Sequence, residues 1–109
     1  MKLIIAVVQD TDAGRLLNAL MKDGHRATKL ASTGGFLREG NTTFLIGTED
    51  DKVDEVLGII EKTCRSRTQL VTPATPLGGA PGPYASFPVE VLVGGATVFV
   101  LNVERFEKL

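Results

Sequence analysis

The sequence predicts an α+β domain in which two helices cover one face of an antiparallel sheet. The first observation is the aliphatic run LIIAVV at residues 3–8, which is typical of a strand covered on both faces. The second is that the chain presents one pattern twice: an aliphatic strand, acidic residues and an amphipathic helix. Strand–helix–strand twice over is the order βαββαβ of the ferredoxin-like fold.

The first helix is predicted to follow the opening strand directly. Asp10, Thr11 and Asp12 are residue types whose side-chain oxygens cap helix starts. The apolar residues that follow have helical spacing: Leu16, Leu17, Leu20 and Met21. Gly24 supplies the left-handed conformation that ends many helices, so a second strand is expected over residues 26–32.

The second strand and helix are predicted between residues 42 and 60. Residues 42–47 have strand character, and a helix is expected to begin at Thr48, with Asp51 at its third position as in a shortened capping box. The apolar stripe of this helix recurs at i, i+3, i+4 and i+7: Val53, Val56, Leu57 and Ile60.

Residues 66–88 interrupt this pattern within a single domain that spans residues 1–109. All five prolines of the chain lie in this segment. Because proline removes hydrogen bonds from a strand ladder, the segment is predicted to be a long flexible loop without regular structure. Residues 89–103 are predicted to form a hairpin whose two-residue turn is Gly94-Gly95.

The strands are apolar on both faces, which predicts self-association. The runs LIIAVV and VFVLNV leave little polar surface on either side, whereas only one face of a ferredoxin-like sheet is covered by helices. An uncovered apolar patch of roughly several hundred Å² is unusual on a soluble monomer. We therefore expect a homo-oligomer with the sheets inside.

Composition limits the classes of function. The formal net charge of −1 argues against a protein whose main partner is nucleic acid. No apolar run approaches the roughly 20 residues that cross a bilayer, and the first apolar run is too short for a signal peptide. A single cysteine excludes an internal disulfide. The expected compartment is the cytoplasm, without membrane insertion.

Neither a catalytic site nor a metal site is predicted. One histidine and one cysteine, His25 and Cys64, cannot supply a zinc site, and no third group orients them as a catalytic pair. Four acidic residues at strand ends are candidates for a divalent cation, although their expected role is to favour helix N-termini. These residues are Asp10, Asp12, Asp50 and Asp51.

The most informative segment for function is RATKLASTGGFLREGNTTFLIG, residues 26–47. Phe36 and Leu37 lie at the tip of a glycine-bracketed loop, where an apolar ring gains nothing unless something covers it. Arg26 offers a fork of donors that matches a phosphate, and glycine amides approach phosphate oxygens closely. Together these groups predict a nucleotide-like ligand, although neither G-x-x-x-x-G-K-[ST] nor G-x-G-x-x-G is present.

Five motifs resemble, in register and over essentially the whole chain, those of the PII-like cyclic di-AMP receptor family: MKLIIAVVQD, RATKLASTGGFL, GNTTFLIG, DDKVDEVL and PVEVLVGGATVFV. The resemblance implies a ferredoxin-like homotrimer without catalytic activity and without a cofactor. It also implies that cyclic di-AMP binds in clefts between subunits, and that the loops pass the signal to a downstream protein.

The resemblance further implies roles for individual residues. Phe36 is expected to stack on an adenine, with Leu37 lining the same pocket. Arg26 and Thr28 are expected to contact the phosphates and the base. The remaining implied ligand residues are Gly35, Asn41 and Gly47, through close backbone approach and amide hydrogen bonds, and Phe99, from the adjacent subunit against the second base.

Two other functions are compatible with the pattern. A ferredoxin-like phosphatase of the acylphosphatase kind would hold phosphate with an Arg and an Asn, here Arg26 and Asn41, but its phosphate-loop motif is absent. An RNA-recognition module would display strand aromatics, here Phe44 and Phe99. The low aromatic content, the acidic net charge and the lack of an RNP1 pattern argue against this second alternative.

Overall fold

The computed structural model describes residues 1–30, 40–71 and 88–109. Of the helices within these ranges, none is long and apolar enough to cross a membrane. The elements in chain order are β1 (Lys2–Gln9), α1 (Asp10–Lys22), β2 (Ala27–Leu30), β3 (Asn41–Thr48), the 3-10 turn η1 (Asp50–Lys52), α2 (Val53–Cys64), β4 (Arg67–Val71), β5 (Val89–Val93) and β6 (Ala96–Asn102).

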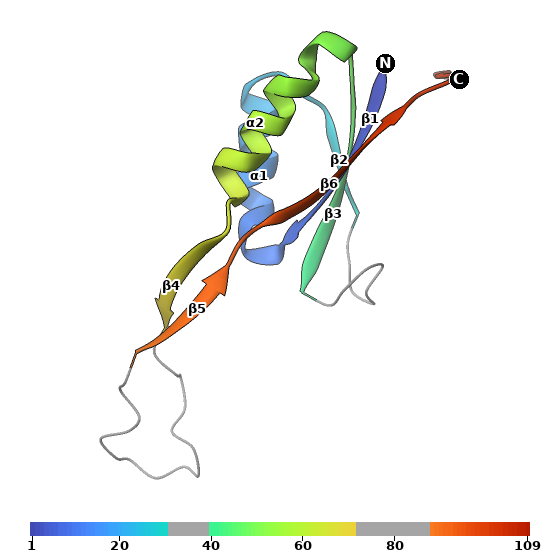
Figure 1. The fold of residues 1–109 in the computed structure, drawn as a ribbon. Coiled ribbons are helices and arrows are strands. Elements are labelled where there is room, and N and C mark those ends of the chain that lie inside the picture. The colour runs from blue at the N-terminus through green and yellow to red at the C-terminus, as the bar shows by residue number, and fades with distance from the viewer. Residues whose placement is uncertain (31–39, 72–87) are drawn as a thin grey trace.

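A four-stranded sheet forms the body of the molecule. Its strand order is β2-β3-β1-β6, and each neighbouring pair is antiparallel. Both α1 and α2 lie on one face of this sheet (Figure 1). This is the ferredoxin-like arrangement, so the predicted fold class is confirmed.

The core lies between the sheet and the two helices. Successive side chains of a strand point to opposite faces, so Ile4, Ala6 and Val8 of β1 all face the helices and are buried. The neighbouring strand β3 adds Phe44, whose side chain is 0% exposed. The helices contribute the buried members of their predicted stripes: Leu16, Leu20, Val56 and Ile60.

The opposite face of the sheet, which we call the open face, carries neither of the two described helices (Figure 1). The register places Ile5 of β1 between Leu45 of β3 and Phe99 of β6. Leu101 lies on the same face, two residues further along β6. Phe99 and Leu101 are 49% and 46% exposed. A single chain therefore leaves an apolar surface on this side, as the patterning of the strands predicted.

The helix starts differ from the prediction. α1 begins at Asp10, but no side chain caps its first turn. The second helix does not begin at Thr48, because β3 extends through this residue to complete its ladder with β1. The turn η1 follows, and α2 begins at Val53, again without a side-chain cap. The acidic residues of these first turns therefore do not act as side-chain caps.

The end of α1 follows the prediction. Gly24 has a φ of +81°, in the left-handed region that favours glycine. The N–H groups of Gly24 and His25 donate to the carbonyls of Met21 and Leu20 at 3.0 and 2.9 Å. These bonds satisfy carbonyls at the helix end and turn the chain toward β2.

The chain after α2 departs from the prediction at two places. Because Arg67–Val71 forms β4, the expected irregular structure across 66–88 is wrong at its start. The predicted hairpin is also wrong, because Val89–Val93 forms β5 and pairs with β4. β6 pairs instead with residues 2–8 of β1, which completes the sheet. β4 and β5 form a two-stranded ribbon that projects from the body (Figure 1).

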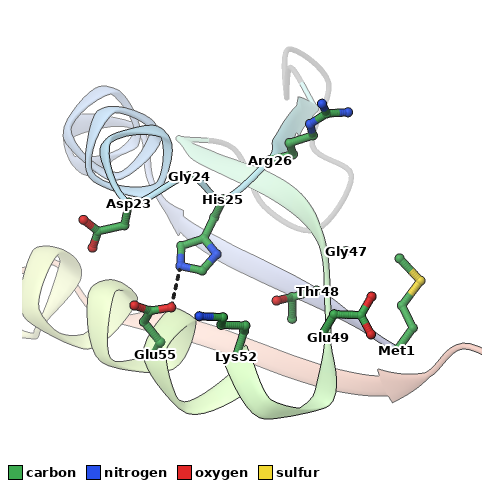
Figure 2. Close-up of a pocket in the computed structure, with 10 residues that line it drawn as sticks. All are labelled: Met1, Asp23, Gly24, His25, Arg26, Gly47, Thr48, Glu49, Lys52 and Glu55. Carbon is green, nitrogen blue, oxygen red and sulfur yellow. Dashed lines mark ion pairs between the residues drawn. The ribbon is translucent and has the colours of Figure 1, made fainter.

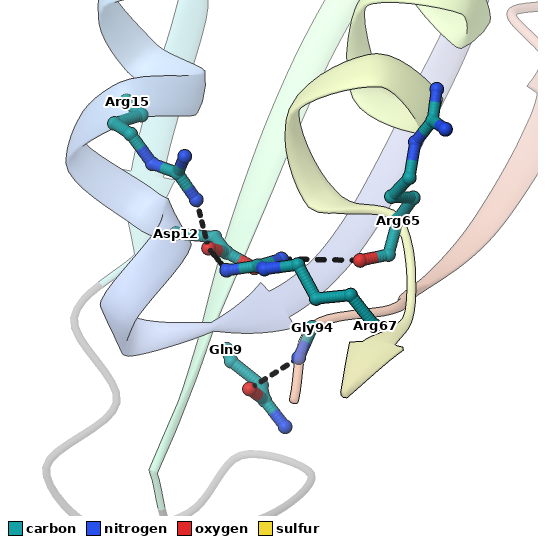
Figure 3. Close-up of polar contacts among 6 residues, drawn as sticks. All are labelled: Gln9, Asp12, Arg15, Arg65, Arg67 and Gly94. Carbon is teal, nitrogen blue, oxygen red and sulfur yellow. Dashed lines mark hydrogen bonds and ion pairs between the residues drawn. The ribbon is translucent and has the colours of Figure 1, made fainter. Parts of the chain in front are cut away.

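A buried carboxylate anchors the base of this ribbon (Figure 3). Asp12, in the first turn of α1, is 0% exposed. Arg67, at the start of β4, donates to it with Nη2 2.8 Å from Oδ1, and Arg15 also donates to Oδ1. Hydrogen bonds from Arg67 hold the pKa of Asp12 below its ordinary value of 3.8, against the opposing effect of burial. Asp12, predicted to cap α1, therefore binds the ribbon.

The two glycines between β5 and β6 complete this junction. Gly94 donates its N–H to Gln9 Oε1 at 2.7 Å, and the N–H of Gly95 donates to the carbonyl of Cys64. Gly94 has a φ of +83°, and a Cβ at this position would collide with the carbonyl oxygen of Arg65. Gly94 is thus needed for close approach to the end of α2, and Gly95 for its φ of +91°, where the chain passes from the ribbon into the sheet.

We expect Asp12→Asn to lower the free energy of unfolding at pH 7 by about 1–2 kcal/mol, since hydrogen bonds between charged groups are lost. This loss lies at the low end of the range for charged hydrogen bonds, because Arg67 is 35% exposed and water screens part of its attraction to Asp12. The folded pKa of Asp12 is depressed, so its contribution is complete above pH 3.8 and is lost as the pH falls through the lower folded value.

Urea unfolding at pH 7 and pH 3 measures this contribution. The difference in free energy of unfolding between wild type and Asp12→Asn should be smaller at pH 3 than at pH 7. Asp54→Asn, an exposed carboxylate on α2, is the control and should change stability little at either pH. An equal difference at both pH values would contradict the role of the Asp12 carboxylate.

Candidate ligand-binding site

Three of the predicted site residues line one pocket at the edge of the sheet. β2 pairs with β3 so that Ala27 lies opposite Ile46, which brings Arg26 beside Gly47. A pocket of about 560 Å³ opens here, lined by Arg26, Thr28 and Gly47 among others. This volume is within the range of small-molecule sites, about 300–1,000 Å³. We call it the sheet-edge pocket.

Strand alternation explains which side chains reach this pocket. Arg26 and Thr28 are two residues apart, so both side chains leave the backbone toward the open face. His25 points the other way, toward the helices, and Figure 2 shows the Arg26 side chain directed away from the His25 ring. Arg26 is exposed, and its guanidinium has the donor geometry that matches a phosphate.

The rest of the sheet-edge pocket is largely apolar, and the sequence pattern did not single out these residues. Leu3 and Leu45 line it from adjacent strands, and Phe106 lines it from the C-terminal tail. The tail reaches this edge because the N–H of Val103 donates to the Met1 carbonyl at 3.1 Å. The ring of Phe106 is 66% exposed. The one signal for Phe106 in the sequence is that it is an aromatic residue in a charged tail. This signal does not show where the tail lies in the fold.

A second pocket, which we call the helix-side pocket, lies between the end of α1 and the start of α2 (Figure 2). Its volume is about 360 Å³, and it shares Met1, Arg26 and Gly47 with the sheet-edge pocket. The rest of its lining is mostly polar: Asp23, Gly24, His25, Thr48, Glu49, Lys52 and Glu55. Arg26 therefore lies at the boundary between two cavities of different chemistry.

His25 and Cys64 do not form a pair. His25 Nε2 lies 3.2 Å from Glu55 Oε2, in the first turn of α2. Cys64 is the last residue of the same helix, about 14 Å further along at about 1.5 Å per residue. Its side chain is buried, and burial raises the pKa of the thiol to about 11, so the thiol is protonated at neutral pH.

The other predicted site residues do not reach the sheet-edge pocket within one chain. Asn41 precedes Gly47 by six residues on β3, which corresponds to about 20 Å at about 3.3 Å per residue. Phe99 lies on β6, and β1 and β3 separate that strand from β2. Three further predicted residues lie outside the described residues: Gly35, Phe36 and Leu37.

The structure weakens the residue arguments for both alternative functions. Phe44 is fully buried in the core, so it is not displayed for an RNA base. Arg26 lies beside Gly47 at one end of β3, whereas Asn41 lies at the other end. One chain therefore cannot hold one phosphate between Arg26 and Asn41, as the phosphatase interpretation requires.

Three of the four acidic residues at strand ends are engaged in contacts within the protein. Asp10 accepts a hydrogen bond from Thr42 Oγ1, and Asp12 binds Arg67. Asp50 lies 2.9 Å from the amino group of Met1, which lowers the pKa of this carboxyl. Across residues 1–30, 40–71 and 88–109, no group of three or more His, Cys, Asp or Glu side chains is placed to hold a metal ion.

Comparison with solved structures identifies a chain of the same fold. It comes from a crystal structure of a protein from Pediococcus pentosaceus ATCC 25745, described as functionally unknown. The two chains are 47% identical, the match covers 99% of this chain and 96% of the other, and the TM-score is 0.77. The similarity therefore extends over the sheet, both helices and the pocket residues.

Comparison with protein families identifies a function. The family model described as "Cyclic-di-AMP receptor" matches residues 1–109. The match spans the whole chain, so it includes the segment 26–47 and the PVEVLVGGATVFV motif on which the resemblance was based. It does not favour the phosphatase or the RNA-binding alternative. The chain belongs to the PII-like cyclic di-AMP receptor family.

Proposed function

We propose that this cyclic di-AMP-binding signalling protein holds its ligand in the sheet-edge pocket, at a cleft between protomers. The observation that carries the proposal is that Arg26, Thr28 and Gly47 line one cavity in a chain that matches the receptor family over its whole length. The pocket combines cationic, hydroxyl, backbone and apolar groups, which are the groups that a purine dinucleotide requires.

Each part of the pocket suits one part of the ligand. The Arg26 guanidinium pairs with a phosphate through two donors, and the Thr28 hydroxyl supplies a further hydrogen bond. The backbone at Gly47 allows close approach of a phosphate or a base. Leu45 and Phe106 offer apolar surface to an adenine, for which aromatic stacking contributes about 1–3 kcal/mol per base.

The other ligand residues complete this site from outside the pocket. Asn41 and Phe99 lie too far from Arg26 to share one ligand with it in the same chain, so we assign them to a neighbouring protomer. Gly35, Phe36 and Leu37, which lie outside the described residues, are expected to add the predicted stacking and backbone contacts. A cleft between protomers accommodates all of these contributions.

We further propose that the assembly is a homotrimer. The apolar open face, with Ile5, Phe99 and Leu101 among its residues, is the surface that other copies cover. A ligand bound in the cleft between protomers stabilises the assembled state by mass action, by about 2.7 kcal/mol at a hundredfold excess over Kd. The loops then present the signal to a downstream protein.

The receptor acts by binding and not by catalysis, with no cofactor besides the ligand. Cys64 supports this proposal, because its thiol is buried and protonated at neutral pH. His25 is paired with Glu55 on the helix side, away from the open face. We place the protein in the cytoplasm, where the single cysteine stays reduced.

Calorimetry with cyclic di-AMP is expected to give saturable binding at one ligand per protomer. Cyclic di-GMP presents different base edges and AMP fills one of two base positions, so both are expected to bind much more weakly. Equal heats for the three ligands, or no heat for any of them, would contradict the proposed function.

Phe36→Ala is expected to weaken cyclic di-AMP binding by about one to two orders of magnitude, which corresponds to the loss of about 1–3 kcal/mol of stacking. The Kd is measured by the same calorimetry. Leu109→Ala, in the exposed tail, is the control and should bind like wild type. Unchanged affinity of Phe36→Ala would mean that the ring has a structural role.

Light scattering at micromolar concentration is expected to give three times the 11.6 kDa mass of one chain. Phe99→Glu places a charge on the open face and is expected to dissociate the assembly, because burying an unpaired charge is strongly unfavourable. Met21→Glu, at an exposed apolar residue of α1, is the matched control and should leave the mass unchanged. A monomeric mass for wild type would rule out the trimer.

A further inference from the structure

Arg26 lies where a short connection from α1 enters the sheet. α1 ends at Lys22, and the ladder between β2 and β3 begins at Ala27. Arg26 precedes this ladder, so no strand pairing holds its backbone. Its orientation therefore depends on the first pair of the ladder on one side and on residues 23–25 on the other, and His25 is its immediate neighbour.

The backbone of His25 is held from α1. Its N–H donates to the carbonyl of Leu20 at 2.9 Å, after Gly24 has turned the chain with a φ of +81°. This geometry directs the His25 side chain toward the helices (Figure 2). Because neighbouring side chains of an extended chain point to opposite sides, the side chain of Arg26 is directed to the open face.

The side chain of His25 ties the same connection to α2. The imidazole is 9% exposed, and its Nε2 lies 3.2 Å from Oε2 of Glu55. Within the part of the chain that the structure describes, Nε2 makes this close contact but no hydrogen bond. A buried polar atom in this state costs stability. Because His25 is next to Arg26, we interpret this loss of stability as a consequence of a functional arrangement.

We propose that His25, held by Glu55, is a positioning residue that aims the Arg26 guanidinium into the sheet-edge pocket. The inference rests on the proposed function of that pocket. While the ring is held between α1 and α2, the next side chain is directed outward before the ligand arrives. Without this restraint, Arg26 samples more orientations, and ordering it on binding weakens the affinity.

Two variants remove the contact in different ways. His25→Phe keeps an aromatic ring in the buried position and removes the ring nitrogens, whereas Glu55→Gln keeps the shape of the partner. Each is expected to raise the Kd for cyclic di-AMP about tenfold, as is common for residues coupled in one network. Asp54→Asn, in the same first turn of α2, is the matched control and should bind like wild type.

A double-mutant cycle separates positioning from a general structural effect. In an Arg26→Ala background, His25→Phe should change the Kd by less than about twofold, because no guanidinium remains to be aimed. Circular dichroism and the melting temperature are measured for every variant. If His25→Phe fails to fold, Glu55→Gln in both backgrounds provides the same test.

Two results would overturn the inference alone: wild-type affinity for both single variants, or a full tenfold loss that persists in the Arg26→Ala background. Wild-type affinity of Arg26→Ala itself would mean that the ligand does not use the sheet-edge pocket. That result would overturn the proposed site, and this inference with it. The failure of one proposal is thus distinguished from the failure of the other.

Discussion

Antiparallel pairing along both edges of β1 determines where the other elements lie. β3 occupies one edge and β6 the other, while the helices cover one of the two faces. Because side chains alternate along a strand, a register shift of one residue would exchange Ile4 of the core for Ile5 of the open face. The same register that builds the core therefore also builds the apolar surface on which the proposed assembly depends.

The first turn of α1 is linked both to the start of β3 and to the base of the ribbon. The N–H of Asp10 donates to the carbonyl of Gly40 at 2.9 Å, just before β3 begins. Asp12, in the same turn, accepts a hydrogen bond from Arg67 of the ribbon. Gln9, the residue just before α1, accepts a hydrogen bond from the N–H of Gly94. The base of the ribbon and the start of β3 are thus held by adjacent residues of a single short segment.

The geometry of β3 separates the proposed site residues into groups. Arg26 and Gly47 lie at one end of this strand, and Asn41 lies at the other. A cyclic dinucleotide is much shorter than the strand, so one chain cannot bring all of these residues to one ligand. This separation is the physical reason for the proposal that the ligand lies between protomers.

The features that the sequence determined by itself are local. The continuous run LIIAVV predicted a strand, and the helical spacing of the two stripes predicted the helices and most of their buried side chains, although Met21 of the first stripe is 62% exposed. Gly24 marked the end of α1 because the left-handed conformation is a local preference of glycine. The motifs of residues 26–47 indicated the family through residue identity, which needs no knowledge of the tertiary fold.

The tertiary structure alone decided the contacts between distant residues. Gly94-Gly95 has the local chemistry of a hairpin turn, yet β6 pairs with β1 and β5 with β4, because completing the sheet outweighs a local turn preference. Asp12 has the chemistry of a helix cap, but Arg67 lies close enough to bind it. Phe106 lines the same pocket as Arg26 only because of the path that the C-terminal tail takes. Such pairings depend on which surfaces meet after folding, and no local pattern encodes that competition.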